Sequence, residues 1–170
     1  SLAACGSTAA SSAASAADST ASSAAESTAA SDTAAADGQT YKVGICQLVQ
    51  HVALDAATQG FKDALTEQLG DAVTFEEKNA QGDSNTCSTI INGFVSDNVD
   101  LILANATPAL QAAQAGTNTI PVLGTSVTEY GVALGIDDFD GLVGTNISGT
   151  SDLAPLDEQA GIIKELFPDA

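Results

Sequence analysis

From residue 41 onward, short apolar runs alternate with longer segments in which apolar residues recur every three or four positions. The short runs predict strands over Tyr41–Val49, Ala72–Lys78, Asp100–Ala104, Ile120–Leu123 and Gly141–Thr145. The longer segments predict helices with one buried face. Strands that alternate with helices are joined by right-handed crossovers and form a parallel sheet. We therefore expect an α/β fold, an open parallel sheet with flanking helices.

The helices are recognised by their apolar spacing and by their start signals. We expect helices over Val52–Leu69, from Asp83 or Ser84 onward, from Thr107 to Gly116, and over Leu156–Phe167. Thr107 followed by Pro108 is typical of a helix start, and the Thr107 hydroxyl is expected to cap that helix.

A segment of low complexity precedes the first predicted strand. Between Gly6 and Gln39, 27 of 34 residues are Ala, Ser or Thr, and none is Val, Ile, Leu or aromatic. Such a segment has no apolar surface whose burial would offset the entropy lost on ordering. We therefore interpret residues 6–40 as a disordered linker that tethers the folded part.

The residues ahead of this linker contain a cysteine in a recognisable setting. The run Leu2-Ala3-Ala4-Cys5, followed by Gly, resembles the lipobox of a bacterial lipoprotein signal peptide. The resemblance implies that residues 1–5 are a signal-peptide remnant and that Cys5 carries a lipid. A lipid there would hold the protein on the cell membrane outside the cytoplasm. An accidental cysteine in a flexible tail is the alternative.

Composition excludes several classes of function. The formal net charge is −18 and there is no Arg, which argues against a nucleic-acid partner. His51 is the only histidine, so we expect no metal site, and no nucleophile motif accompanies it. We expect no catalytic residues and no cofactor. No apolar run reaches the length of a membrane-spanning helix.

Two cysteines fall within the predicted fold. Cys46 lies in the first strand and Cys87 on the apolar face of the second helix. We expect both to be small core residues. A disulfide between them is possible outside the cytoplasm, although two positions in a sequence do not support it.

Ligands of open parallel sheets bind beyond the carboxyl ends of the strands, where the strand order switches. That rule selects Gln47–Asp55, Asn79–Gly82, Asn105–Pro108 and Thr125–Thr128, which are rich in polar residues and glycine. Two of these stretches lead into helix starts, where free N–H groups and the helix dipole favour a carboxylate. We expect a small polar ligand at this edge.

Four motifs resemble one family of substrate-binding proteins of ABC importers, which includes tryptophan- and tyrosine-binding proteins. The family begins with a VGI strand, a Q/E-H-P-x-L-D segment and a G-F pair. The corresponding run here is VGICQLVQHVALDAATQGFKDAL, with Val52 in place of the proline. The other three motifs are Ala106-Thr107-Pro108, the run IPVLGTSVT, and NISGTSDLAPLDEQAGIIKEL from Asn146 to Leu166.

The resemblance implies an N-terminal lobe of the periplasmic-binding-protein-like fold at residues 41–150. Residues 151–170 would then be a crossover and the first helix of a missing second lobe. Family members close two lobes around a ligand, and those similar to this chain bind aromatic amino acids. The implied partners are a small-molecule ligand, with an amino acid expected, and the membrane permease of an ABC importer.

The strand ends and the resemblance together predict the ligand contacts. The ligand carboxylate is expected at Thr107 and the helix start beside Pro108, with the loop Ser126, Val127 and Thr128 next to it. Gln47, His51 and Leu54 are expected to border an aromatic ring, with Asp55 in the same segment and Asn146 and Ser148 at the crossover. For His51, a cap on the first helix is the alternative.

Two other functions remain open from the sequence. A ligand-sensing lobe of a membrane-bound receptor would have the same fold, and only its partner would differ. A flavodoxin-like enzyme would need a phosphate loop or paired acids after the first strand, and the run QLVQHVALD contains neither.

Overall fold

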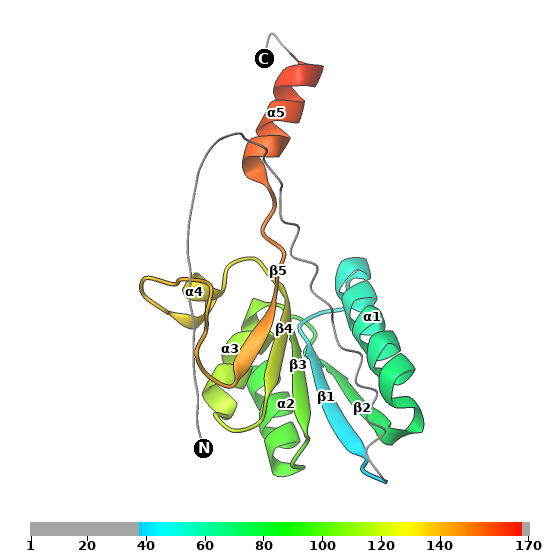
Figure 1. The fold of residues 1–170 in the computed structure, drawn as a ribbon. Helices are drawn as coiled ribbons and strands as arrows, with labels where there is room; N and C mark the ends of the chain where they lie inside the picture. The colour runs from blue at the N-terminus through cyan, green and yellow to red at the C-terminus, as the bar shows by residue number, and fades with distance from the viewer. Residues whose placement is uncertain (1–37, 168–170) are drawn as a thin grey trace, which may run out of the picture. The chain divides into compact units, whose positions relative to one another are not determined.

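The computed structural model describes residues 38–167, so Cys5 and most of the predicted linker lie outside the described part. Five strands form one sheet in the order β2-β1-β3-β4-β5, and every neighbouring pair is parallel (Figure 1). The strands are β1 (Tyr41–Gln47), β2 (Val73–Asn79), β3 (Leu101–Asn105), β4 (Val122–Val127) and β5 (Ile147–Ser151). The predicted α/β architecture is confirmed.

The described residues form five α-helices. They are α1 (Val52–Leu69), α2 (Ser84–Ser96), α3 (Thr107–Gly116), α4 (Tyr130–Leu134) and α5 (Leu156–Leu166), with a short 3-10 turn at Gly70–Ala72 after α1. The α2, α3 and α4 helices pack on one face and α1 on the other. The short α4 helix was not predicted, because five residues carry too little periodicity to indicate a helix.

The start of α3 differs from the prediction. Its N-cap residue is Ala106, no side chain caps it, and Thr107 is already the first helical residue. The predicted capping role of the Thr107 hydroxyl is therefore wrong. In α2 the prediction holds, since the Asp83 carboxylate accepts a hydrogen bond from the backbone N–H of Thr86 at 2.6 Å.

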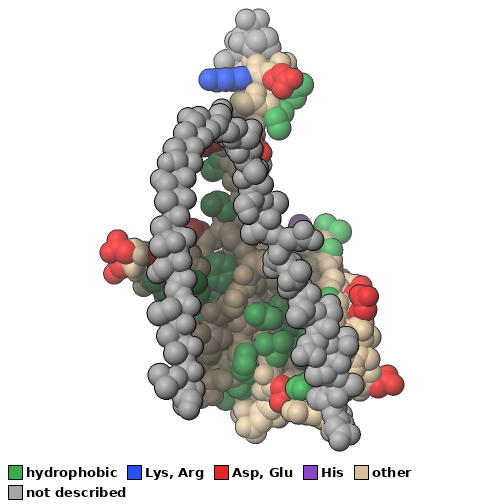
Figure 2. Space-filling view, viewed as in Figure 1, with side chains coloured by type: hydrophobic (Ala, Val, Ile, Leu, Met, Phe, Trp, Pro, Cys, Tyr) green, Lys and Arg blue, Asp and Glu red, His purple; other side chains and the backbone are tan. Residues whose placement is uncertain are grey.

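The hydrophobic core is divided unequally between the two faces. On the α2–α3 face Phe94, Ile91 and Leu110 are fully buried, together with much of α3 and α4. On the α1 face the buried cluster has four members, and Phe61 of α1 packs against it while only partly covered. The space-filling view shows apolar side chains on this face of the sheet (Figure 2). Burial of apolar surface therefore stabilises the α2–α3 side more strongly.

The fifth strand is not where the sequence predicted it. Gly141 and Gly144 have positive φ angles and lie in a loop, whereas the strand runs over Ile147–Ser151. Its sequence, ISGTS, has one apolar residue, because β5 is an edge strand whose side chains are exposed apart from Ile147. At Gly149 a Cβ atom would collide with the backbone of Gly124. Polar edge strands lack the apolar run that predicts a strand.

The α5 helix, predicted over almost the same residues, buries none of its side chains. Its apolar residues Leu156, Ile162, Ile163, Leu166 and Phe167 are between 54% and 67% exposed. Within residues 38–167, every helix is too short or too polar to cross a membrane.

Candidate functional site

Polar residues end most strands of the sheet. Gln47 ends β1, Asn79 ends β2, Asn105 ends β3 and Ser151 ends β5. Gln47 is in register with both Asn79 and Asn105, so the three amides lie side by side at one edge. The chain crosses from β1 to β2 on one side and then to β3 on the other, which makes the β1–β3 pair the switch point. The predicted ligand edge therefore coincides with a row of polar side chains.

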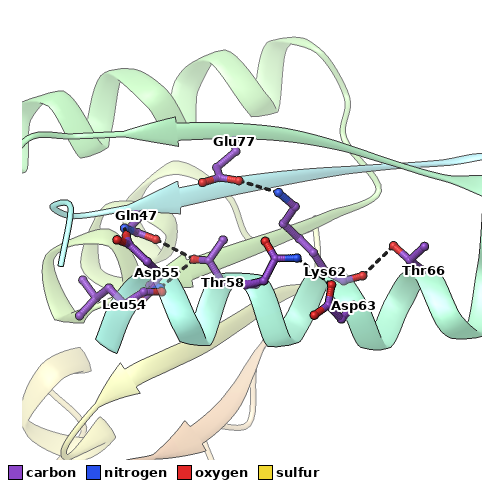
Figure 3. Close-up of polar contacts among 10 residues, drawn as sticks. Gln47, Leu54, Asp55, Thr58, Lys62, Asp63, Thr66 and Glu77 are labelled. Carbon is purple, nitrogen blue, oxygen red and sulfur yellow. Dashed lines mark hydrogen bonds and ion pairs between the residues drawn. The ribbon is translucent and has the colours of Figure 1, made fainter. Parts of the chain in front are cut away.

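A buried hydrogen-bond network connects β1, β3 and α1 at this switch point (Figure 3). The Thr58 hydroxyl donates to Gln47 Oε1 at 2.8 Å and accepts from Asn105 Nδ2 at 2.9 Å. Gln47 Nε2 in turn donates to Asp55 Oδ1 at 2.6 Å and to the carbonyl oxygen of Val49 at 2.9 Å. Gln47, Thr58 and Asn105 are all buried. The network fixes the first turn of α1 against the strand ends.

Asn105 brings an unmatched acceptor into this network. Its Nδ2 also donates to the carbonyl oxygen of Leu54 at 2.8 Å, while its Oδ1 is buried and has no hydrogen-bond partner. Exchanging Oδ1 and Nδ2 by rotating the amide would place two acceptor oxygens, Oδ1 and the Leu54 carbonyl, against each other. The hydrogen bonds donated by Nδ2 therefore determine the orientation of the Asn105 amide. An unpaired buried acceptor is costly and uncommon in folded proteins.

Three of the five non-glycine residues with a positive φ angle in the described part of the chain lie at the same edge. Ala106, directly after β3, has φ 92 and ψ 157, a conformation that is almost restricted to glycine. Ser126 near the end of β4 and Gln81 after β2 also have positive φ angles, of 56 and 55. Strained residues gather at ligand sites because the surrounding structure holds them in a functional position.

The first turn of α3 begins at this strained residue. The first backbone bond of the helix runs from the Leu110 N–H to the Ala106 carbonyl at 3.1 Å. Thr107 and Pro108 form the half-buried first turn, to which no side chain provides a cap. Unpaired N–H groups and the positive end of the helix dipole can hold a carboxylate there.

The predicted residues of the β1–α1 segment lie together, although their contacts differ. His51 is exposed, and its Nδ1 accepts a hydrogen bond from the Ala53 N–H at 3.2 Å, which confirms the alternative of a helix cap. Leu54 is half-buried and Asp55 is exposed in the first turn of α1. Both amide atoms of Gln47 are engaged within the network, so this side chain supports the edge from beneath.

The residues predicted as a loop after the fourth strand belong in part to that strand, because β4 runs to Val127 and does not end at Leu123. Ser126 is half-buried and Thr128 is exposed, and the Thr128 carbonyl accepts a hydrogen bond from the Ser151 hydroxyl at 2.7 Å. Val127 is fully buried in the core, so its side chain does not face the edge.

Asn146 and Ser148 do not join the other predicted residues. Asn146 precedes β5 at the end of the sheet where the strands begin, opposite the ligand edge, and its Nδ2 donates to the carbonyl oxygens of Thr117 and Ile120. Ser148 lies within β5 and lines a cavity of about 330 Å³ beside α1. The positions of Asn146 and Ser148 were predicted wrongly because the fifth strand begins later than the sequence predicted. A strand ending at residue 145 would have put both residues at its carboxyl end.

Thr58 and the network role of Asn105 were not predicted from the sequence. Thr58 is a polar residue on the helix face that turns toward the sheet, and Asn105 ends an apolar strand. A polar residue at either of these buried positions could have predicted a hydrogen-bonded pair, since buried polar groups need partners. Within residues 38–167, no three His, Cys, Asp or Glu side chains gather into a possible metal site.

A parallel sheet with polar strand ends at its switch point, beside an uncapped helix start, is the arrangement in which open α/β lobes bind small polar molecules. The sequence assigns this lobe to a family. Residues 42–170 match the ABC transporter substrate binding protein family, and the chain belongs to it.

Known proteins of similar sequence and fold agree with this assignment. A tyrosine-binding protein of Clostridioides difficile strain R20291 is 41% identical over 131 residues, which are 75% of this chain and 38% of that protein. A ligand-free, open structure of a Clostridium difficile substrate binding protein with adhesive properties has a TM-score of 0.69 and 41% identity. A Streptococcus pneumonia ABC domain in complex with L-Trp has a TM-score of 0.69 and 30% identity.

Each of these two structures is matched over 77% of this chain and 45% of its own length. The chain therefore spans less than half the length of the relatives it matches.

Proposed function

We propose that this chain is the N-terminal ligand-binding lobe of a solute-binding protein that delivers an amino acid to an ABC importer, with an aromatic side chain favoured. Substrate-binding proteins of ABC importers work outside the cytoplasm. The observation that carries the proposal is the row of polar strand ends beside the uncapped start of α3. The tyrosine and L-Trp named for two relatives support an aromatic ligand.

The ligand carboxylate is placed at the first turn of α3. The Thr107 hydroxyl and the unpaired N–H groups of that turn are donors, and the left-handed conformation of Ser126 brings a second hydroxyl to the same edge. Thr128 lies beside it. A charged acceptor at a helix start is favoured by both hydrogen bonding and the dipole.

The aromatic ring is placed against the start of α1. Leu54 and His51 provide its contact surface, while the buried network of Gln47, Thr58 and Asn105 holds that turn in place. Asp55 is the nearby anionic group, suited to the ligand's ammonium group.

A second lobe completes the site in this proposal. One lobe leaves a ligand open to solvent on one side, and enclosure is what gives small-molecule sites their affinity. The α5 helix, whose apolar side chains are exposed, is proposed to be the first helix of that second lobe.

Titration calorimetry on the two-lobed protein tests this function with a panel of free amino acids. We expect tyrosine or tryptophan to bind below the millimolar range. Thr107→Ala removes a hydrogen bond to a charged group, worth about 1.5–3 kcal/mol, so affinity should fall about 10- to 150-fold. Thr107→Ser should restore most of the loss.

The matched control is Thr66→Ala, which removes an exposed hydroxyl near the far end of α1 and should leave affinity unchanged. If no amino acid binds below the millimolar range, the proposed ligand class is wrong. If one binds and Thr107→Ala has the affinity of the parent, the placement of the carboxylate is wrong.

A further inference from the structure

Two buried cysteines occupy the base of the ligand edge without a role in the proposed binding. Cys46 is the second-last residue of β1, and Cys87 lies in the first turns of α2. Both have no exposed surface, both belong to the same hydrophobic cluster, and both are free thiols in this structure.

Backbone hydrogen bonds bring the two cysteines together. The loop between β2 and α2 is attached to the end of β1 by bonds from Ala80 N–H to the Gln47 carbonyl at 2.9 Å and from Gly82 N–H to the Leu48 carbonyl at 2.7 Å. The α2 helix then starts at Ser84 and turns Cys87 onto the sheet, where the helix packs against β1. A thiol one turn into α2 therefore lies over the end of β1.

The environment protects both thiols once the chain is folded. Burial, followed by the neighbouring Cys87 thiol, raises the pKa of Cys46, and burial raises the pKa of Cys87. Thiolates are the reactive form in disulfide exchange, so the folded, reduced protein should react slowly. Closure of a disulfide would have to take place while α2 is still packing onto β1.

We infer that Cys46 and Cys87 are a disulfide-forming pair, closed during folding outside the cytoplasm by exchange with a low-molecular-weight disulfide such as oxidised glutathione. One thiolate attacks the oxidant, forms a mixed disulfide and releases one small thiol. The second cysteine then displaces the other small thiol and closes the protein disulfide. The two protein thiols lose two electrons and two protons, and the oxidant is reduced to two thiols.

The resulting bond would join β1 to α2 directly below Gln47. It would enclose the β1–α1 loop, α1 and β2, all of which lie between the two cysteines in the sequence. Cross-links of that length restrict the unfolded chain and raise stability. The inference does not depend on the proposed ligand.

The 170-residue chain carrying Cys5→Ser tests the inference, because only Cys46 and Cys87 then remain. The chain is refolded in a mixture of reduced and oxidised glutathione, unfolded, treated with iodoacetamide and weighed by mass spectrometry. We expect a monomer that has lost two hydrogen atoms and takes up no label. Its unfolding midpoint should lie roughly 10 °C above that of the same chain in reductant.

The control carries Cys46→Ala as well, and reductant should not change its midpoint. The inference is overturned if both thiols are alkylated after oxidative refolding, or if the product is a covalent dimer.

Discussion

At the residue scale, the ligand edge depends on groups that the ligand is not expected to touch. The Thr58 hydroxyl connects two buried amides, one from β1 and one from β3, and both are fully or almost fully removed from water. Buried polar groups of this kind stabilise a structure only while their partners are present.

Replacing Thr58 by Val keeps the shape of the side chain and removes the hydroxyl. Gln47 Oε1 then loses its donor inside the protein, which should lower the free energy of unfolding by about 1–3 kcal/mol. Thr58→Ser is the matched control, since it keeps the hydroxyl and loses one methyl group, at a cost of about 0.8 kcal/mol. Urea unfolding measures both, and a Val variant as stable as the Ser variant would contradict the role of the hydroxyl.

Ala106 offers a second test, because its backbone conformation suits glycine better than alanine. Ala106→Gly should remove backbone strain of about 1–3 kcal/mol from the folded state. Glycine also raises the conformational entropy of the unfolded chain, which should lower stability by about 0.4–1 kcal/mol. We expect a net gain in stability of about 1 kcal/mol, measured by urea unfolding. Ala64→Gly, at an exposed position inside α1, should instead cost about 1 kcal/mol. Equal losses in the two variants would show that Ala106 is not strained.

At the scale of single elements, the start of α2 gives a pH dependence with a definite sign. Hydrogen bonds from Thr86, the backbone N–H first, hold the pKa of the Asp83 carboxyl below its ordinary value. A carboxyl with a lowered pKa in the folded state contributes stability above its unfolded pKa. That contribution is lost as the pH falls below the ordinary carboxyl pKa of 3.8 and through the lower pKa of the folded state.

Asp83→Asn separates the charge from the cap, since asparagine is also a good N-cap residue. At pH 7 the parent should melt at a higher temperature than the variant, because a negative charge at a helix start interacts with the dipole. The difference between the two should shrink as pH falls to about 3, followed by circular dichroism. A difference that stays constant over this range would contradict the assignment.

The accuracy of the sequence-based predictions varied from element to element for physical reasons. The β3 strand is apolar from Leu101 to Ala104 because both of its faces are covered, and its position was predicted to within one residue. The edge strand β5 and the short helix α4 lack that apolar pattern. Because β5 was predicted at the wrong residues, Asn146 and Ser148 were also predicted in the wrong place. The Gln47–Thr58–Asn105 network was also not predicted, because pairings between distant residues depend on the assembled fold.

At the scale of the whole molecule, membership of the family extends the expectation beyond the described residues. We propose in addition that Cys5 carries a lipid anchor, which the Ala- and Ser-rich residues 6–40 would separate from the lobe.

The anchor is tested on full-length protein extracted from membranes of a bacterium that processes lipoproteins. We expect mass spectrometry of the N-terminal peptide to find diacylglycerol on Cys5, and the protein to sediment with membranes. The variant Cys5→Ala should lose both properties. An unmodified Cys5 in the membrane-extracted parent would remove the anchor from the proposal.

The unequal division of the core has a consequence for motion within the lobe. Thr58 is the one buried side chain of α1, so this helix should open locally at a lower free energy than α2 or α3, and its amide hydrogens should exchange sooner. The proposed ring contacts, Leu54 and His51, lie at the start of that helix. A ligand that contacts these residues would slow amide hydrogen exchange along all of α1. Ligand binding at the strand ends could then be detected by exchange at α1 residues far from the site.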